Sequence, residues 1–151
     1  MNPSTDEALR ELLDRAAIHD VMLRYARGVD RRDLDLVAAC FLQDASYEGA
    51  LASGTIAEAL VRLRERMTRY DSTMHFIGNQ LVELDGDTAN SETYAVAYHR
   101  LTGDSRGKLF TVGVRYLDEL IRDANGWRIR ARVVKMEWQR SEALSPDSSA
   151  L

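Results

Sequence analysis

The stretch Thr73-Met74-His75-Phe76-Ile77-Gly78-Asn79 places an imidazole inside an apolar, β-prone segment. On a strand, successive side chains point to opposite faces. The alternation predicts two sets of residues that face opposite ways, both buried: Thr73, His75, Ile77 and Leu81 on one side, and Met74, Phe76 and Val82 on the other. A buried neutral histidine needs a partner for each ring nitrogen. The chemistry of the chain is therefore expected to gather around His75.

The chain on the C-terminal side of this stretch is rich in β-prone residues. Turn signals at 85–87 and 123–126, and a polar loop with two glycines at 102–107, divide it into segments. The expected strands span about residues 73–84, 88–102, 108–121 and 127–138. Such a series of consecutive strands is typical of an antiparallel meander.

The chain on the N-terminal side is mainly helical by pattern. Apolar residues recur at three- and four-residue spacing and predict helices over about residues 6–28, 33–42 and 55–70, with a short strand near 45–49. Thr5 and Asp33 are the expected N-caps of the first two helices, and Gly28 is the expected end of the first. The polar face of the third helix is expected to be a solvated surface, and it carries Arg62, Arg64, Glu65, Arg66 and Arg69.

Three helices followed by a meander indicate an α+β fold. A strongly curved, mostly antiparallel sheet wrapped over the long first helix would enclose a cavity, and alternate strand residues would line it. A single domain over residues 1–140 is expected, followed by a mobile, serine-rich tail over residues 141–151.

Composition excludes several classes of partner. The chain has 151 residues, 45% of them hydrophobic, which suits one domain with a real core. A net charge of −4 argues against nucleic acid, which calls for a basic surface. No segment approaches the roughly 20 apolar residues that span a bilayer, and no signal core is found near Met1, so a cytoplasmic protein without a membrane partner is expected. The single cysteine, Cys40, is expected to be buried.

Four residues could form a reactive site: Tyr25, Asp30, Tyr47 and His75. Asp30 has two interpretations. It caps the second helix or pairs with a neighbouring arginine at the surface, or it points inward and accepts a hydrogen bond from His75. His75 is likewise either a satisfied core histidine or a catalytic base. Tyr47 by itself is a packing aromatic. The three histidines show no tight ligand spacing, so no metal is expected.

Several segments, in this order along the chain, carry a resemblance to a known family: 23–30, 44–49, 73–79, 85–89, 92–94 and 126–129. Over about residues 8–140 the chain resembles the SnoaL-like branch of the NTF2-like (nuclear transport factor 2-like) superfamily. Within that branch it is most similar to scytalone dehydratase, hexachlorocyclohexane dehydrochlorinase and bile-acid 7α-dehydratase. The resemblance implies the cone-shaped α+β barrel of that superfamily.

The same resemblance implies roles for the candidate residues. Asp30 and His75 match the Asp–His dyad of these enzymes, Tyr25 matches the catalytic tyrosine of the bile-acid enzyme, and Tyr47 resembles a substrate-binding tyrosine of scytalone dehydratase. The chain also departs from them. Val29 stands where scytalone dehydratase has a tyrosine, and Ala97 stands where the bile-acid enzyme has its second acid. The second cavity histidine of scytalone dehydratase has no clear counterpart, because His99 is near it in sequence but not at the matching position.

The activity that the resemblance implies is abstraction of a carbon-bound proton without a cofactor. Imidazole titrates near neutral pH, which suits a general base. The expected function is that of a lyase, of the dehydratase or dehydrohalogenase type, or of an isomerase acting on a small, apolar, cyclic or polyketide-like molecule. The alternatives are a non-catalytic small-molecule binder and an assembly subunit like the small subunit of ring-hydroxylating dioxygenases. A homodimer or homotrimer is expected, because both faces of the sheet need cover.

Overall fold

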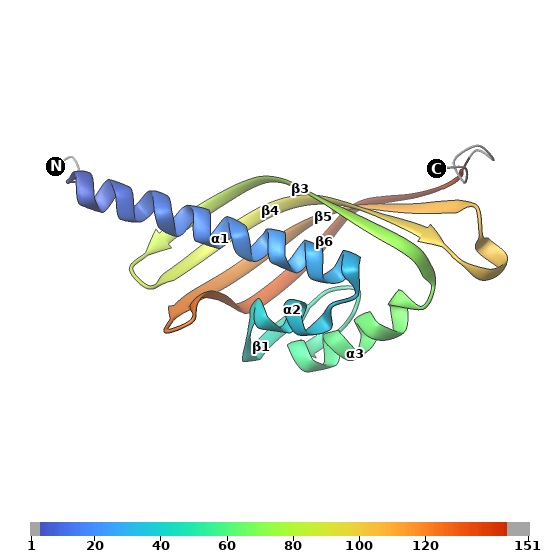
Figure 1. The fold of residues 1–151 in the computed structure, drawn as a ribbon, viewed down its shortest axis with the longest axis horizontal. Helices are drawn as coiled ribbons and strands as arrows, with labels where there is room; N and C mark the ends of the chain where they lie inside the picture. Colours follow the sequence, from blue (N-terminus) through green and yellow to red (C-terminus); the bar gives the residue numbers. More distant parts are fainter. Residues whose placement is uncertain (1–3, 145–151) are drawn as a thin grey trace.

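The long first helix crosses one face of a curved sheet, and two shorter helices lie near one of its ends (Figure 1). The computed structural model describes residues 4–144. The helices are α1 Thr5–Arg31, α2 Leu34–Ala39 and α3 Ile56–Met67. The strands are β1 Phe41–Glu48, β2 Ser53–Thr55, β3 Tyr70–Asp85, β4 Thr88–Leu101, β5 Lys108–Asp123 and β6 Gly126–Ala143. The α+β fold expected from the sequence is confirmed.

The six strands form one sheet in the order β2-β1-β6-β5-β4-β3. Strands β3 to β6 form the predicted antiparallel meander. β1 pairs with β6 in parallel, and the short β2, which the sequence did not predict, pairs with β1. β6 extends to Ala143, so it includes the start of the segment expected to be a tail; the rest of that segment, from residue 145, lies outside the described residues.

Helix α1 differs from the prediction at both ends. Ser4, rather than Thr5, is its N-cap, and it forms a capping box with Glu7. The helix does not end at Gly28; it continues to Arg31, and Arg32 follows in the left-handed conformation with φ 59°. Gly28 serves close packing instead, because a Cβ there would lie 2.7 Å from Cγ2 of Val37. The missing side chain lets α2 approach α1.

The two short helices begin where the sequence predicts and end earlier. The Asp33 side chain accepts a hydrogen bond from the Leu36 amide at 2.9 Å, which confirms it as the N-cap of α2. α3 ends at Met67 rather than at Tyr70, because Tyr70 is already the first residue of β3. Among the described residues, no helix is long and apolar enough to cross a membrane.

A β-bulge in β3 changes which residues face inward. The register with β4 shifts by one residue between Ile77 and Gln80. The inward face therefore carries odd-numbered residues from Thr73 to Ile77 and even-numbered residues from Gln80 onward. The prediction that Leu81 is buried beside His75 was wrong, because Leu81 is 65% exposed. The prediction that both faces are buried was also wrong for this chain, because Phe76 is 67% exposed on the outer face.

Candidate active site

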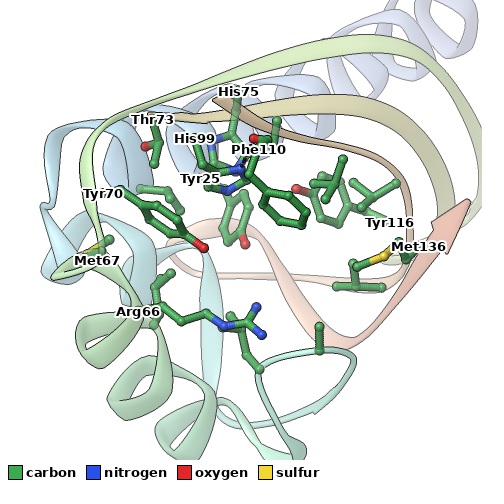
Figure 2. Close-up of a pocket in the computed structure, with 18 of the residues that line it drawn as sticks. Tyr25, Arg66, Met67, Tyr70, Thr73, His75, His99, Phe110, Tyr116 and Met136 are labelled. Atoms are coloured by element: carbon green, nitrogen blue, oxygen red, sulfur yellow. Dashed lines mark hydrogen bonds between the residues drawn. The ribbon is translucent and has the colours of Figure 1, made fainter. Parts of the chain in front are cut away.

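A cavity of about 140 Å³ lies between the sheet and the helices, and most of its lining is apolar (Figure 2). The wall is formed by residues of α1 and α3, by residues of β1 and β3–β6, and by Ala50 and Leu51 in the connection between β1 and β2. All three predicted site residues with rings, His75, Tyr25 and Tyr47, line this cavity. Asp30 is the fourth predicted residue, and it reaches the cavity through His75.

Asp30 and His75 are joined by two hydrogen bonds. Nδ1 of the ring lies 2.7 Å from Oδ1 of Asp30, and the His75 backbone amide donates to Oδ2 at 2.8 Å. The Thr73 hydroxyl donates to Oδ1 at 2.8 Å. A carboxylate only accepts, so the proton of the neutral imidazole resides on Nδ1 and leaves Nε2 with a free lone pair. Within residues 4–144, Nε2 has no hydrogen-bond partner.

The local fold brings the carboxylate to the strand. Asp30 lies in the last turn of α1, where the helix dipole disfavours a negative charge, so the three donors have to offset that effect. Burial raises the pKa of Asp30, but the hydrogen bonds from His75 and Thr73 outweigh it and leave the pKa below its usual value. Arg32 holds the helix end against the start of β3 by donating to the carbonyl oxygen of Tyr70 at 2.6 Å. Asp30 thus takes the inward position, the second of its two interpretations.

Tyr25 and Tyr47 both line the cavity. Tyr25 packs edge-on against Phe41 and Tyr116, with ring centroids 6.1 and 5.6 Å away. Burial raises the pKa of both Tyr25 and Tyr47 above the ordinary phenol value. Both phenols therefore stay protonated at neutral pH and can act as hydrogen-bond donors to a guest in the cavity.

A second histidine, His99, also lines the cavity, although in sequence it does not match the second cavity histidine of scytalone dehydratase. The His99 ring lies 6.0 Å from the His75 ring in an edge-to-face arrangement and 4.7 Å from the Tyr70 ring. Its Nδ1 lies 3.1 Å from the carbonyl oxygen of Phe110, so Nδ1 is protonated and Nε2 can accept. Burial lowers the pKa of His99 to about 4. His99 is therefore a neutral acceptor at physiological pH.

The bulge in β3 explains why sequence reasoning missed His99. Counted back from the turn pair Asp85↔Thr88 without a bulge, His99 would pair with Met74, on the outer face. With the bulge it pairs with Thr73. Directly paired residues share a face of the sheet, so the shift brings both imidazoles to the cavity. The glycine at position 78 was the only local signal for an irregular strand.

Arg66 is a further lining residue that the sequence did not identify. It was expected on the solvated face of α3, but it reaches the cavity from that helix (Figure 2). Its charge adds to the lowering of the pKa of His99 and opposes the rise in the pKa of Tyr47. The Arg66 guanidinium is thus close enough to act on both Tyr47 of β1 and His99 of β4.

A buried ion pair supports the aromatic wall from behind. Arg132 and Asp118 are fully buried and joined by two hydrogen bonds, of 2.7 and 2.8 Å. The Arg132 guanidinium carbon lies 4.3 Å from the Tyr25 ring centroid and 4.4 Å from that of Tyr116. A cation in this position holds both rings by cation–π attraction, which is stronger when the groups are desolvated.

Comparison with known proteins agrees with this architecture. The family profile of the SnoaL-like domain matches residues 10–133. The uncharacterised protein Rv2910c of Mycobacterium tuberculosis is 30% identical over 130 residues, which cover 83% of this chain and 87% of that protein.

Several solved structures share the fold. Hexachlorocyclohexane dehydrochlorinase LinA-type3 of Novosphingobium barchaimii superposes with a TM-score of 0.78 at 21% identity, covering 90% of this chain and 94% of the other. A Novosphingobium aromaticivorans protein with a provisional scytalone dehydratase assignment superposes with a TM-score of 0.77 at 19% identity, covering 95% and 98%. At these identities the likeness concerns the fold.

Proposed function

Because this chain belongs to the SnoaL-like domain family, we propose that it is a cofactor-independent lyase or isomerase. In this proposal His75 removes a carbon-bound proton from a small cyclic molecule held in the cavity. Asp30 orients the ring and stabilises the imidazolium that forms. The Asp30–His75 hydrogen bond of 2.7 Å, with Nε2 left free beside a cavity, is the observation that carries the proposal.

The chemistry needs only groups that the chain supplies. Nε2 of His75 takes the proton, and the electrons of the broken C–H bond form a carbon–carbon double bond or an enolate. A general base in position contributes roughly 10²–10⁴-fold to the rate. The phenol of Tyr25 or Tyr47 donates a hydrogen bond to the substrate oxygen on which negative charge grows, and this stabilises the transition state.

Two outcomes follow from the same first step. If a halide or a hydroxyl group leaves from the adjacent carbon with its bonding electrons, the reaction is an elimination. A departing hydroxyl group takes up the proton from the imidazolium and leaves as water. If His75 returns the proton to a different carbon, the reaction is an isomerisation. The names of the two structural neighbours describe eliminations, which favours the lyase.

A binding protein without turnover is the second candidate, and the same cavity favours it.

The test uses NMR to follow the exchange of solvent deuterium into a panel of cyclic ketones and β-hydroxy ketones. We expect wild-type protein to catalyse exchange or elimination with at least one compound, and His75→Gln to lose it. His19→Gln is the matched control, because His19 bonds to Gln80 and does not line the cavity.

The outcomes separate the candidates. Exchange that survives in His75→Gln would remove His75 as the base. If the wild-type protein binds these compounds but catalyses neither exchange nor elimination, the enzymatic proposal is wrong and the binding protein is the remaining candidate.

A further inference from the structure

Arg66 carries the only permanent charge among the described residues that line the cavity, and no described lining residue carries a carboxylate. The close-up shows its side chain entering from α3 on the side of the cavity away from His75 (Figure 2). Within residues 4–144 the guanidinium has no ion-pair partner, whereas Arg62 on the same helix is paired with Glu65. An unpaired cation at the edge of an apolar cavity is suited to an anionic ligand.

We propose that Arg66 binds an anionic oxygen substituent of the substrate, so that the natural substrate is a one-ring organic acid. The carboxylate is the anion that matches best, because the guanidinium fork bonds its two oxygens side by side. This inference rests on the proposed function for one point only, namely that a ring carbon of the same molecule lies next to His75.

Charge decides which way such a molecule lies. The carboxylate of Asp30 lies directly behind His75, bonded to its ring at 2.7 Å. His99 is neutral and presents a lone pair on Nε2, because its Nδ1 proton is held by the Phe110 carbonyl. Both features repel an anionic oxygen from the dyad end of the cavity. The anion therefore turns toward Arg66, and the uncharged ring carbons turn toward Nε2 of His75.

Size sets the second restriction. The cavity measures about 140 Å³. An apolar protein cavity of about 150 Å³ holds one benzene molecule. One six-membered ring thus fills the space, and its acidic substituent extends to the edge, where the exposed Arg66 meets it. A fused polycyclic acid would not fit without movement of the walls.

The test compares benzoate with benzamide, a neutral molecule of nearly the same shape, by NMR titration at pH 7.5 and low salt. We expect wild-type protein to bind benzoate about tenfold more tightly than benzamide, as a charge-assisted hydrogen bond implies. Arg66→Gln should bind the two equally. Arg64→Gln is the matched control, since Arg64 is an exposed arginine of the same helix that does not line the cavity.

Two further measurements sharpen the test. The preference for benzoate should weaken as salt rises, because the pair is partly exposed. It should persist in His75→Gln, because the anion is held away from the dyad. A benzoate preference that persists in His75→Gln, together with a wild-type protein that catalyses neither exchange nor elimination, would therefore remove the proposed function and leave the binding of an anion by Arg66 standing.

Three results would overturn the inference. The first is equal binding of the two probes, or binding of neither, by wild-type protein. The second is an undiminished preference for benzoate in Arg66→Gln. The third is an equal loss of preference in Arg64→Gln, which would indicate the general charge of α3 rather than one side chain.

Discussion

His75 and His99 face the same cavity, with ring centroids 6.0 Å apart, because a one-residue bulge between Ile77 and Gln80 shifts the register of β3 against β4. The two rings differ in their partners. Nδ1 of His75 is bonded to the carboxylate of Asp30, and Nδ1 of His99 is bonded to the carbonyl oxygen of Phe110. The ring of His75 therefore has a carboxylate as its partner, whereas His99 is held neutral. Similar residues acquire different roles from their surroundings.

Asp30→Asn tests the partner of the base. The amide keeps the shape of the side chain but removes the charge that stabilises the imidazolium, so we expect the exchange or elimination rate to fall roughly 10²–10⁴-fold. The rate should be measured against His75→Gln and against Asp35→Asn, an exposed acid of α2 that does not line the cavity. A rate within threefold of wild type would contradict a role for Asp30 in catalysis.

His99 makes the stability of the protein depend on pH. Its pKa falls from the ordinary 6.5 to about 4 in the folded chain, so the unfolded chain binds more protons between these values. The free energy of unfolding should therefore decrease as the pH falls through this window, by up to about 3 kcal/mol. Urea unfolding of wild type and His99→Gln at pH 7 and pH 4.5 measures the effect, and the variant should lose most of this slope.

The neighbours of His99 also contribute to the dependence of the free energy of unfolding on pH. The charged or titratable groups that act on it are His75, Arg66 and Asp30. Asp30 has a lowered pKa, so its contribution is present above the usual aspartate range and is lost only as the pH falls through the lower, folded value. The two windows are separate. Equal slopes in wild type and His99→Gln between pH 7 and pH 4.5 would show that His99 is protonated normally in the folded chain.

Arg132 and Asp118 should stabilise the fold only as a pair. Removing one partner leaves the other charge buried and unpaired, so Asp118→Asn and Arg132→Met should each lower the free energy of unfolding by about 3–5 kcal/mol. The double variant Arg132→Met/Asp118→Asn should lose less than the sum of the losses of the two single variants. Glu119→Gln is the control, because its pair with Arg130 is exposed and should contribute about 1 kcal/mol or less. Losses below 1 kcal/mol in both single variants would contradict the prediction.

We propose that the outer face of the sheet is covered by further copies of the chain, in a dimer or a trimer. Phe76 and Trp138 are exposed there, at 67% and 47%, and both line one shallow groove with Tyr94. Sedimentation at micromolar concentration should show an oligomer in wild type and a smaller species in Phe76→Glu. Val61→Glu, an exposed apolar residue on α3, is the control. A monomeric wild-type protein would contradict the proposal.

The sequence by itself determined the order and type of the main elements, and its resemblance to a known family suggested the Asp30–His75 pair. Apolar periodicity, caps such as Asp33 and the turn at residues 85–87 are local signals, and a local motif is enough to suggest two partners. The sequence also indicated Tyr25 and Tyr47 as neighbours of the cavity, through their resemblance to family residues.

Only the tertiary structure decided how far α1 runs, which face each half of β3 presents, and what else reaches the cavity. Gly28 reads as a helix end in sequence, but close packing against Val37 explains it. The inward turn of His99 depends on one bulge, and the entry of Arg66 depends on how α3 lies beside the sheet. Strand register and helix placement arise from contacts between segments far apart in the chain, so no local pattern specifies them.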